Sequence, residues 1–187
     1  RDAQESRGLG DVYKRQMGVG IDDLQGYLDV IVTTNNKANT TAADLMDAFI
    51  GCGGAARAAG MNYKETSTAL GILANNGIKG SEAGTALNSM LVRISTKDVA
   101  QKAFKDLGVA VYDSSGEMRN MRDILVDLNG AMAGMTQEQK NSYMSAIAGT
   151  NYYSQFGYLL DGVKEGVNGS ASVSYTHLRA HETPKHL

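Results

Sequence analysis

Apolar residues recur every three or four positions along most of the chain between residues 24 and 163, which is the spacing of helices that bury one face. The clearest case has apolar residues at positions 121, 124, 125, 128 and 132. Six further stripes have the same spacing: Leu24–Ile31, Leu45–Phe49, Thr66–Leu73, Ala83–Ile94, Ala100–Leu107 and Tyr152–Val163. The pattern predicts a mainly α fold, built as an array of short helices.

Helix boundary signals accompany these stripes. A capping residue followed three positions later by an acid or amide can satisfy the free N–H groups at a helix start. Five such pairs occur: Thr41 with Asp44, Asn62 with Glu65, Ser95 with Asp98, Asn120 with Asp123, and Thr136 with Gln139. Glycines at positions 60, 77 and 108 lie just past stripes, where a helix end needs a left-handed residue.

One segment departs from the helical pattern. Residues 109–119 read VAVYDSSGEMR, with alternating valines followed by a turn-forming Asp-Ser-Ser-Gly sequence. This arrangement predicts a small β-hairpin between two helices, with Gly116 in its turn. The turn also resembles a fragment of a calcium-binding loop, but the remaining ligands and the distal Glu are missing, so we favour a plain turn.

The segment from Asn76 to Ser81 is predicted to be a structural turn. Gly77 should take a positive φ, Ile78 should pack back on the helix it leaves, and Gly80 should precede Ser81 as the N-cap of the next helix. A phosphate-binding loop containing Lys79 is the alternative. Such a loop needs a preceding apolar strand and the order Gly-Lys-Ser/Thr, and both are missing here. The phosphate-binding alternative is therefore disfavoured.

The small-residue run GCGGAARAAG, residues 51–60, has two interpretations. Small side chains could let two helices approach closely. Alternatively, the glycines could loosen a helix end, since each interior Gly costs about 1 kcal/mol. From the sequence alone we favour the loosened end.

Both ends of the chain look foreign to the rest. Residues 6–16 read SRGLGDVYKRQ and residues 173–183 read VSYTHLRAHET. These are translations of the two strands of one DNA duplex that resembles a transposon-end sequencing adapter. We therefore expect three segments: 1–16 derived from the adapter, 17–171 natural and an internal fragment of a longer chain, and 172–187 derived from the adapter.

Removing these ends removes most of the available chemistry. All three histidines and the single proline lie in the final segment, so the natural part has no His, Pro or Trp, and one cysteine, Cys52. The ends also hold six of the basic and four of the acidic residues, so the net charge changes from −2 to −4. Nothing here favours catalysis, a cofactor, a metal, specific nucleic-acid binding or membrane contact.

Two longer stretches point to a family. Residues 69–95, ALGILANNGIKGSEAGTALNSMLVRIS, and residues 105–140, KDLGVAVYDSSGEMRNMRDILVDLNGAMAGMTQEQK, closely resemble the core region of phage tail tape measure proteins. The likeness covers about residues 25–165. This chain has Ser115-Gly116 where the family often has Asn-Gly, and Asn120 where it often has Pro.

The resemblance implies a structural role and no catalytic residues. Tape measure proteins set tail length during assembly of the tail tube and leave it when DNA is ejected. The implied partners are other copies of the chain, tail tube proteins and tail assembly chaperones. The implied location is the tail interior of the virion, after assembly in the bacterial host cytoplasm. The alternative is a helical protein-binding adaptor unrelated to phage tails. The residues singled out are structural turn positions only: Gly77, Gly80, Ser81 and Gly116.

Overall fold

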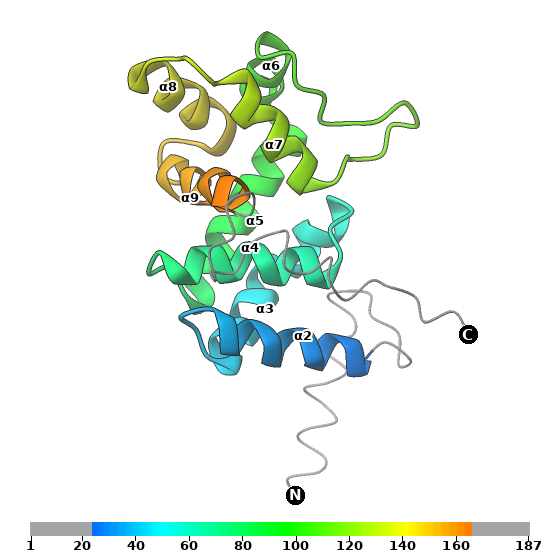
Figure 1. The fold of residues 1–187 in the computed structure, drawn as a ribbon. Helices are drawn as coiled ribbons and strands as arrows, with labels where there is room; N and C mark the ends of the chain where they lie inside the picture. The colour runs from blue at the N-terminus through cyan, green and yellow to red at the C-terminus, as the bar shows by residue number, and fades with distance from the viewer. Residues whose placement is uncertain (1–23, 166–187) are drawn as a thin grey trace, which may run out of the picture.

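The computed structural model describes residues 24–165, and the chain there is helical (Figure 1). The eight helices of this part are α2 (Leu24–Lys37), α3 (Ala42–Ala58), α4 (Tyr63–Asn75), α5 (Gly80–Thr96), α6 (Asp98–Asp106), α7 (Met121–Ala131), α8 (Gln137–Ala148) and α9 (Tyr153–Glu165). The mainly α fold predicted from the apolar spacing is thus confirmed. Residues 1–16 and 172–187, predicted to derive from the adapter, lie outside the described residues, as do the two ends of segment 17–171.

The helices form two groups joined by α5 (Figure 1). In the first group α2 packs on α4, and α3 makes its most extensive contact with α5. In the second group α6 packs on α8, and α7 and α8 both pack on α9. The long α5 contacts α3 and α4 at one end and α6 and α8 at the other, while α9 also packs on α4. One continuous apolar core therefore runs through both groups.

Helix α4 is the central element of this core. All nine residues from Thr66 to Ala74 are buried, including three consecutive hydroxyl residues. Each hydroxyl is satisfied: Thr66 Oγ1 donates to the Asn62 carbonyl at 2.8 Å, Thr68 Oγ1 donates to the Lys64 carbonyl at 2.9 Å, and Ser67 Oγ lies 2.7 Å from Thr34 Oγ1 of α2. Hydroxyls that bond to backbone within their own helix can be buried without an unpaired polar group. The stripe predicted for Thr66–Leu73 described only one of the buried faces.

Four of the five predicted caps are observed. The side chains at positions 41, 62, 120 and 136 each accept a backbone N–H in the first turn of their helices. The fifth was wrong, because α5 continues to Thr96 and so contains Ser95. The Ser95 hydroxyl donates to the Leu91 carbonyl at 2.7 Å within that helix, and Lys97 takes the cap position of α6.

The β-hairpin predicted near residues 109–119 was also wrong. Within residues 24–165 the β pairing consists of one isolated antiparallel bridge, between Tyr112 and Met118. The alternating valines that suggested a strand, Val109 and Val111, are both buried in the helical core instead. Two backbone hydrogen bonds close the turn, Asp113 N to Glu117 O at 2.9 Å and Arg119 N to Val111 O at 2.9 Å. The chain then returns to α7, so no ladder grows beyond this bridge.

Candidate functional site

Backbone hydrogen bonds from the turn between α4 and α5 end helix α4. Gly77 has a φ of 86°, its N–H donates to the Ala74 carbonyl at 3.0 Å, and the Ile78 N–H donates to the Leu73 carbonyl at 3.0 Å. This is the Schellman arrangement, in which a left-handed glycine precedes an apolar residue that packs back on the helix. Ile78 does pack against the core. Gly60 and Gly108 end α3 and α6 with the same pair of bonds and also have positive φ.

The start of α5 differs from the prediction. The helix begins at Gly80, and Lys79 occupies the cap position without a side-chain cap bond. Ser81 is therefore in the first turn and is not the N-cap. The reason is that the Lys79 carbonyl already accepts the first helical hydrogen bond, from Ala83 N at 3.4 Å. Gly80 takes a positive φ of 56° at this point, a conformation that favours glycine.

Lys79 has a local structural partner. Its Nζ donates to Asn39 Oδ1 at 3.2 Å, and the Asn39 backbone N–H donates to Asn75 Oδ1 at 2.8 Å. These bonds fasten the α2–α3 connection to the α4–α5 turn. A helix precedes this turn, whereas a phosphate loop needs a strand. The geometry thus supports a connector and gives the phosphate-loop alternative no support.

Helices α3 and α5 cross backbone to backbone. A Cβ placed on Gly84 would lie 2.4 Å from the Ala48 carbonyl oxygen, and one on Gly51 would lie 3.2 Å from the Gly84 carbonyl carbon. Residues 51–58 continue α3 without a break. The preference for a loosened helix end was therefore wrong, and within the run it is Gly51 that serves the close helix approach. In the sequence, only the run that contains Gly51 suggested a close helix contact. Nothing in the sequence identifies Gly84 as its partner.

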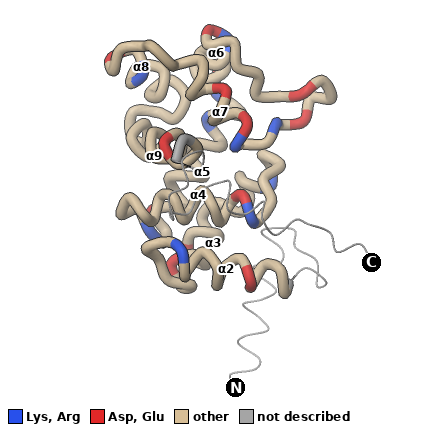
Figure 2. Tube along the Cα trace, in the orientation of Figure 1, with Lys and Arg blue, Asp and Glu red and all other residues tan. Residues whose placement is uncertain are grey.

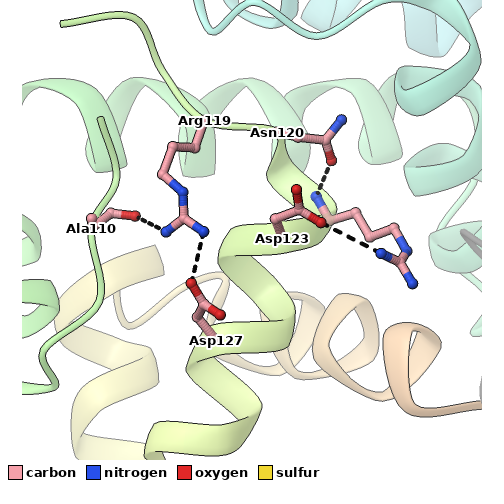
Figure 3. A network of polar contacts seen from close by, with 6 residues as sticks. Ala110, Arg119, Asn120, Asp123 and Asp127 are labelled. Atoms are coloured by element: carbon pink, nitrogen blue, oxygen red, sulfur yellow. Dashed lines mark hydrogen bonds and ion pairs between the residues drawn. The ribbon is translucent and has the colours of Figure 1, made fainter. Parts of the chain in front are cut away.

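A polar network holds the α6–α7 connection against α7 (Figure 3). The Arg119 guanidinium donates to the Ala110 carbonyl at 2.7 Å and to Asp127 Oδ2 at 2.8 Å. Arg119, near the end of the α6–α7 connection, thus links the start of that connection to the second turn of α7. Sequence analysis did not single out Arg119, because neither partner is close to it along the chain in a helical or strand register.

The caps of two distant helices are also linked. Asn120 accepts the Arg122 N–H at the start of α7, and its amide Nδ2 donates to Glu65 of α4. Glu65 in turn accepts the Asn62 N–H at 3.1 Å in the capping box of α4. One carboxylate therefore serves both helix starts. The sequence predicted each cap but contained no signal that the two would meet.

The tip of the α6–α7 connection is an ordered turn. Asp113 Oδ1 accepts hydrogen bonds from the Ser115 hydroxyl at 2.6 Å and from the backbone N–H groups of Ser115 and Glu117. The bond from the Ser115 hydroxyl, followed by those from backbone N–H groups, lowers the pKa of Asp113. Gly116 completes the turn with a φ of 85°. This turn and the Asn76–Ser81 turn belong to different connections, so the predicted turn residues do not form one site.

Reactive chemistry is sparse in this part of the chain. Cys52 is fully buried, and burial raises the pKa of its thiol to about 12, so it remains a neutral, inaccessible thiol. Among residues 24–165, no group of His, Cys, Asp and Glu side chains is placed to hold a metal ion. No helix in the same range is long and apolar enough to cross a membrane.

Two hollows on the surface of the described residues lie between helices. A hollow of about 390 Å³ lies between α7, α8 and α9, with Met132, Met144 and Leu160 among its lining residues. A second hollow, of about 430 Å³, lies between α5 and the α8–α9 connection. The charged lining residues are Lys140 and Asp161 in the first hollow and Arg93 and Lys97 in the second, and neither lining includes His or Cys.

Comparison with known proteins points to phage tails. The family model of phage-related minor tail proteins matches residues 3–149. The chain is 34% identical over 148 residues to the tape measure protein of Pneumococcus phage Dp-1, covering 79% of this chain and 13% of that relative. It is 30% identical over 169 residues to the probable tape measure protein of Escherichia phage P2, covering 89% of this chain and 21% of that relative. No solved structure matches the chain.

Proposed function

Because the chain belongs to the phage-related minor tail protein family, we propose that it is a folded core module of a tape measure protein. The observation that carries this proposal is the 34% identity over 148 residues to the tape measure protein of phage Dp-1. The chain spans 13% and 21% of the lengths of the two relatives, and we propose that it is one module of a longer protein. In this role the full protein sets tail length during tail tube assembly and leaves the tube on DNA ejection.

The fold supports a structural role for the module. The described helices bury one continuous core, and their connections are fixed by hydrogen bonds rather than arranged around a reaction site. The partners we propose are other copies of the chain, tail tube proteins and tail assembly chaperones. The proposed location is the interior of the phage tail, after assembly in the host cytoplasm. We propose no catalysis and no cofactor for this segment.

A module exchange tests this function. In the phage Dp-1 tape measure gene, the matched stretch is replaced by residues 24–165 of this chain. We expect infectious particles with tails of the parental length, as measured by electron microscopy. The matched control is the same exchange carrying Gly84→Val, which places a branched side chain against α3 and should abolish tail formation. Parental tails that form equally well with an unrelated helical domain in this position would contradict the proposal.

We also propose that the natural module is contained in residues 17–171. In that case Arg1–Gln16 and Val173–Leu187 were not selected to pack on the core. Deleting both segments should leave the melting temperature unchanged, as measured by differential scanning calorimetry. A clear decrease in the melting temperature would show that the ends contribute to the fold.

A further inference from the structure

The hollow between α5 and the α8–α9 connection is basic and has no acidic lining. Its lining includes Asn88, Val92 and Arg93 of α5, and Lys97 between α5 and α6, with Thr150 and Asn151 of the connection. Arg93 donates through Nε to the Ala146 carbonyl at 3.2 Å, which holds its guanidinium beside the connection. Among residues 24–165, the ion pairs involve other cations, so neither Arg93 nor Lys97 is paired with a carboxylate there. The hollow thus presents two positive charges to solvent.

An apolar group lies within this basic surface. Val92 is 43% exposed and lines the same hollow. The amide and hydroxyl groups around it can donate and accept hydrogen bonds. This combination of positive charge, hydrogen-bonding groups and one apolar contact suits a short acidic segment that also carries an aromatic or aliphatic side chain.

The chain itself carries a segment of that description. The α6–α7 connection projects from the body of the molecule, and its acidic positions lie on the projecting part (Figure 2). These positions are Asp113 and Glu117, which are both exposed, and Tyr112 beside them is 41% exposed. The turn is already ordered by the Asp113 hydrogen bonds, so docking would cost little conformational entropy. The charges of the two surfaces are therefore complementary.

The α6–α7 connection and the α8–α9 connection lie on different sides of the molecule. In Figure 1 the α6–α7 connection projects to the right, and the α8–α9 connection lies on the left. A segment on one side cannot close on a hollow at the other side of the same copy, but it can reach the hollow of a neighbouring copy. Contacts between two different surfaces are heterologous and can repeat from copy to copy.

We propose that the acidic tip of the α6–α7 connection, residues 112–117, docks in the basic hollow of a second copy of this chain. This inference rests on the proposed association of tape measure copies and names the surfaces that make it. One such contact is small, so isolated copies associate weakly and the association weakens with salt. In a long protein whose copies are held together elsewhere, high effective concentration would strengthen the same contact.

Single-cysteine variants test the contact directly. Ser114→Cys puts a thiol at the tip and Asn151→Cys puts one in the hollow, while the native Cys52 is fully buried and protected. A short bifunctional maleimide should cross-link a mixture of the two variants, and should not cross-link either variant alone. The matched control replaces Asn151→Cys with Asn36→Cys, an exposed position on α2, and should give no cross-link with the tip.

Charge reversal gives a second measurement. In sedimentation velocity of the whole chain at low salt, Lys97→Glu or Glu117→Lys should each weaken self-association about tenfold. The variant with both changes should recover most of the loss, because the charges are again complementary. Loss in each single variant with recovery in the double variant, together with the mixed cross-link, supports the proposed contact.

Other outcomes separate this inference from the proposed function. If the chain self-associates but the mixed cross-link fails, these surfaces are wrong and association of copies stands. If the chain sediments as a monomer at every concentration and no cross-link forms, this docking contact is overturned, and so is self-association through this module. The membership in a tail protein family would remain, so the module exchange in phage Dp-1 would still decide the structural role.

Discussion

The α4–α5 turn and the α6–α7 connection both join two helices, but they are held in different ways. The first leaves α4 at Asn75 and enters α5 at Gly80, and main-chain bonds from Gly77 and Ile78 define it. The second runs from Asp106 to Met121 and depends on the side chains of Asp113 and Arg119. A short connection can be specified by local backbone conformation, whereas a long one needs side chains that reach across it.

The largest effect is expected at the crossing of α3 and α5, where the two backbones are in close contact. The α4–α5 turn leads directly into this crossing. Gly84→Ala places a Cβ 2.4 Å from the Ala48 carbonyl oxygen, and a backbone atom cannot move aside as a flexible side chain would. We expect a loss of about 3 kcal/mol in the free energy of unfolding, from overpacking. Urea denaturation measures it. Gly54→Ala is the matched control, because a Cβ there meets nothing within 4 Å. Equal effects from both substitutions would contradict the close crossing.

The next effect is expected in the turn itself. Gly77→Val should cost more than about 1 kcal/mol, because a β-branched residue is strained at a φ of 86°. No atom lies within 4 Å of a Cβ at this position, so the cost comes from the backbone alone. Gly77→Asn should recover much of it, since Asn tolerates left-handed conformations better. A stable Gly77→Val variant would show that the turn can adopt another backbone path.

In the long connection, removal of one side chain should have a smaller effect. Arg119→Ala deletes bonds to Ala110 and Asp127 but leaves a partly exposed site, so we expect a loss of about 1 kcal/mol. Limited proteolysis should show faster cleavage within residues 109–119 than in the parent chain. Arg119→Lys is the control, because it keeps the charge but lacks the planar guanidinium that donates to both acceptors. Unchanged proteolysis in Arg119→Ala would mean that backbone bonds suffice here too.

The smallest effect is expected at Lys79. Its bond to Asn39 is exposed, so Lys79→Ala should change stability by no more than about 0.5 kcal/mol. Adding nucleotide to the whole chain should leave its thermal transition unchanged. A dose-dependent increase in melting temperature, absent in Lys79→Ala, would revive the phosphate-loop hypothesis.

The same contrast explains what the sequence could predict. Apolar spacing, four caps and the left-handed glycine at position 77 are local signals, and each corresponds to an observed feature. Ser95 failed as a cap because its hydroxyl donates to a carbonyl inside α5. Ser81 failed because Lys79 occupies the cap position of that helix. The predicted hairpin failed because Val109 and Val111 are buried against helices. Their alternate spacing has this cause, although it looks like the pattern of a strand.

Features that depend on contacts between distant residues could not be predicted. The Gly51–Gly84 approach, the Arg119 network and the Asn120–Glu65 link each join segments with no common sequence signal. The candidate site shows the same limit. Individual turn glycines were identifiable, but the basic hollow combines residues 88–97 with residues 148–152, which are far apart along the chain.

The all-round burial of α4 also determines how this part of the molecule can open. Backbone amides exchange with solvent through fraying or local openings where an element has a free face. From Thr66 to Ala74 no residue is exposed, and the neighbours of α4 include α2, α3, α5 and α9. Exposing these amides requires several of those helices to detach together. Their hydrogen–deuterium exchange should therefore be the slowest in the chain and should report the free energy of global unfolding, while α2 exchanges through smaller openings.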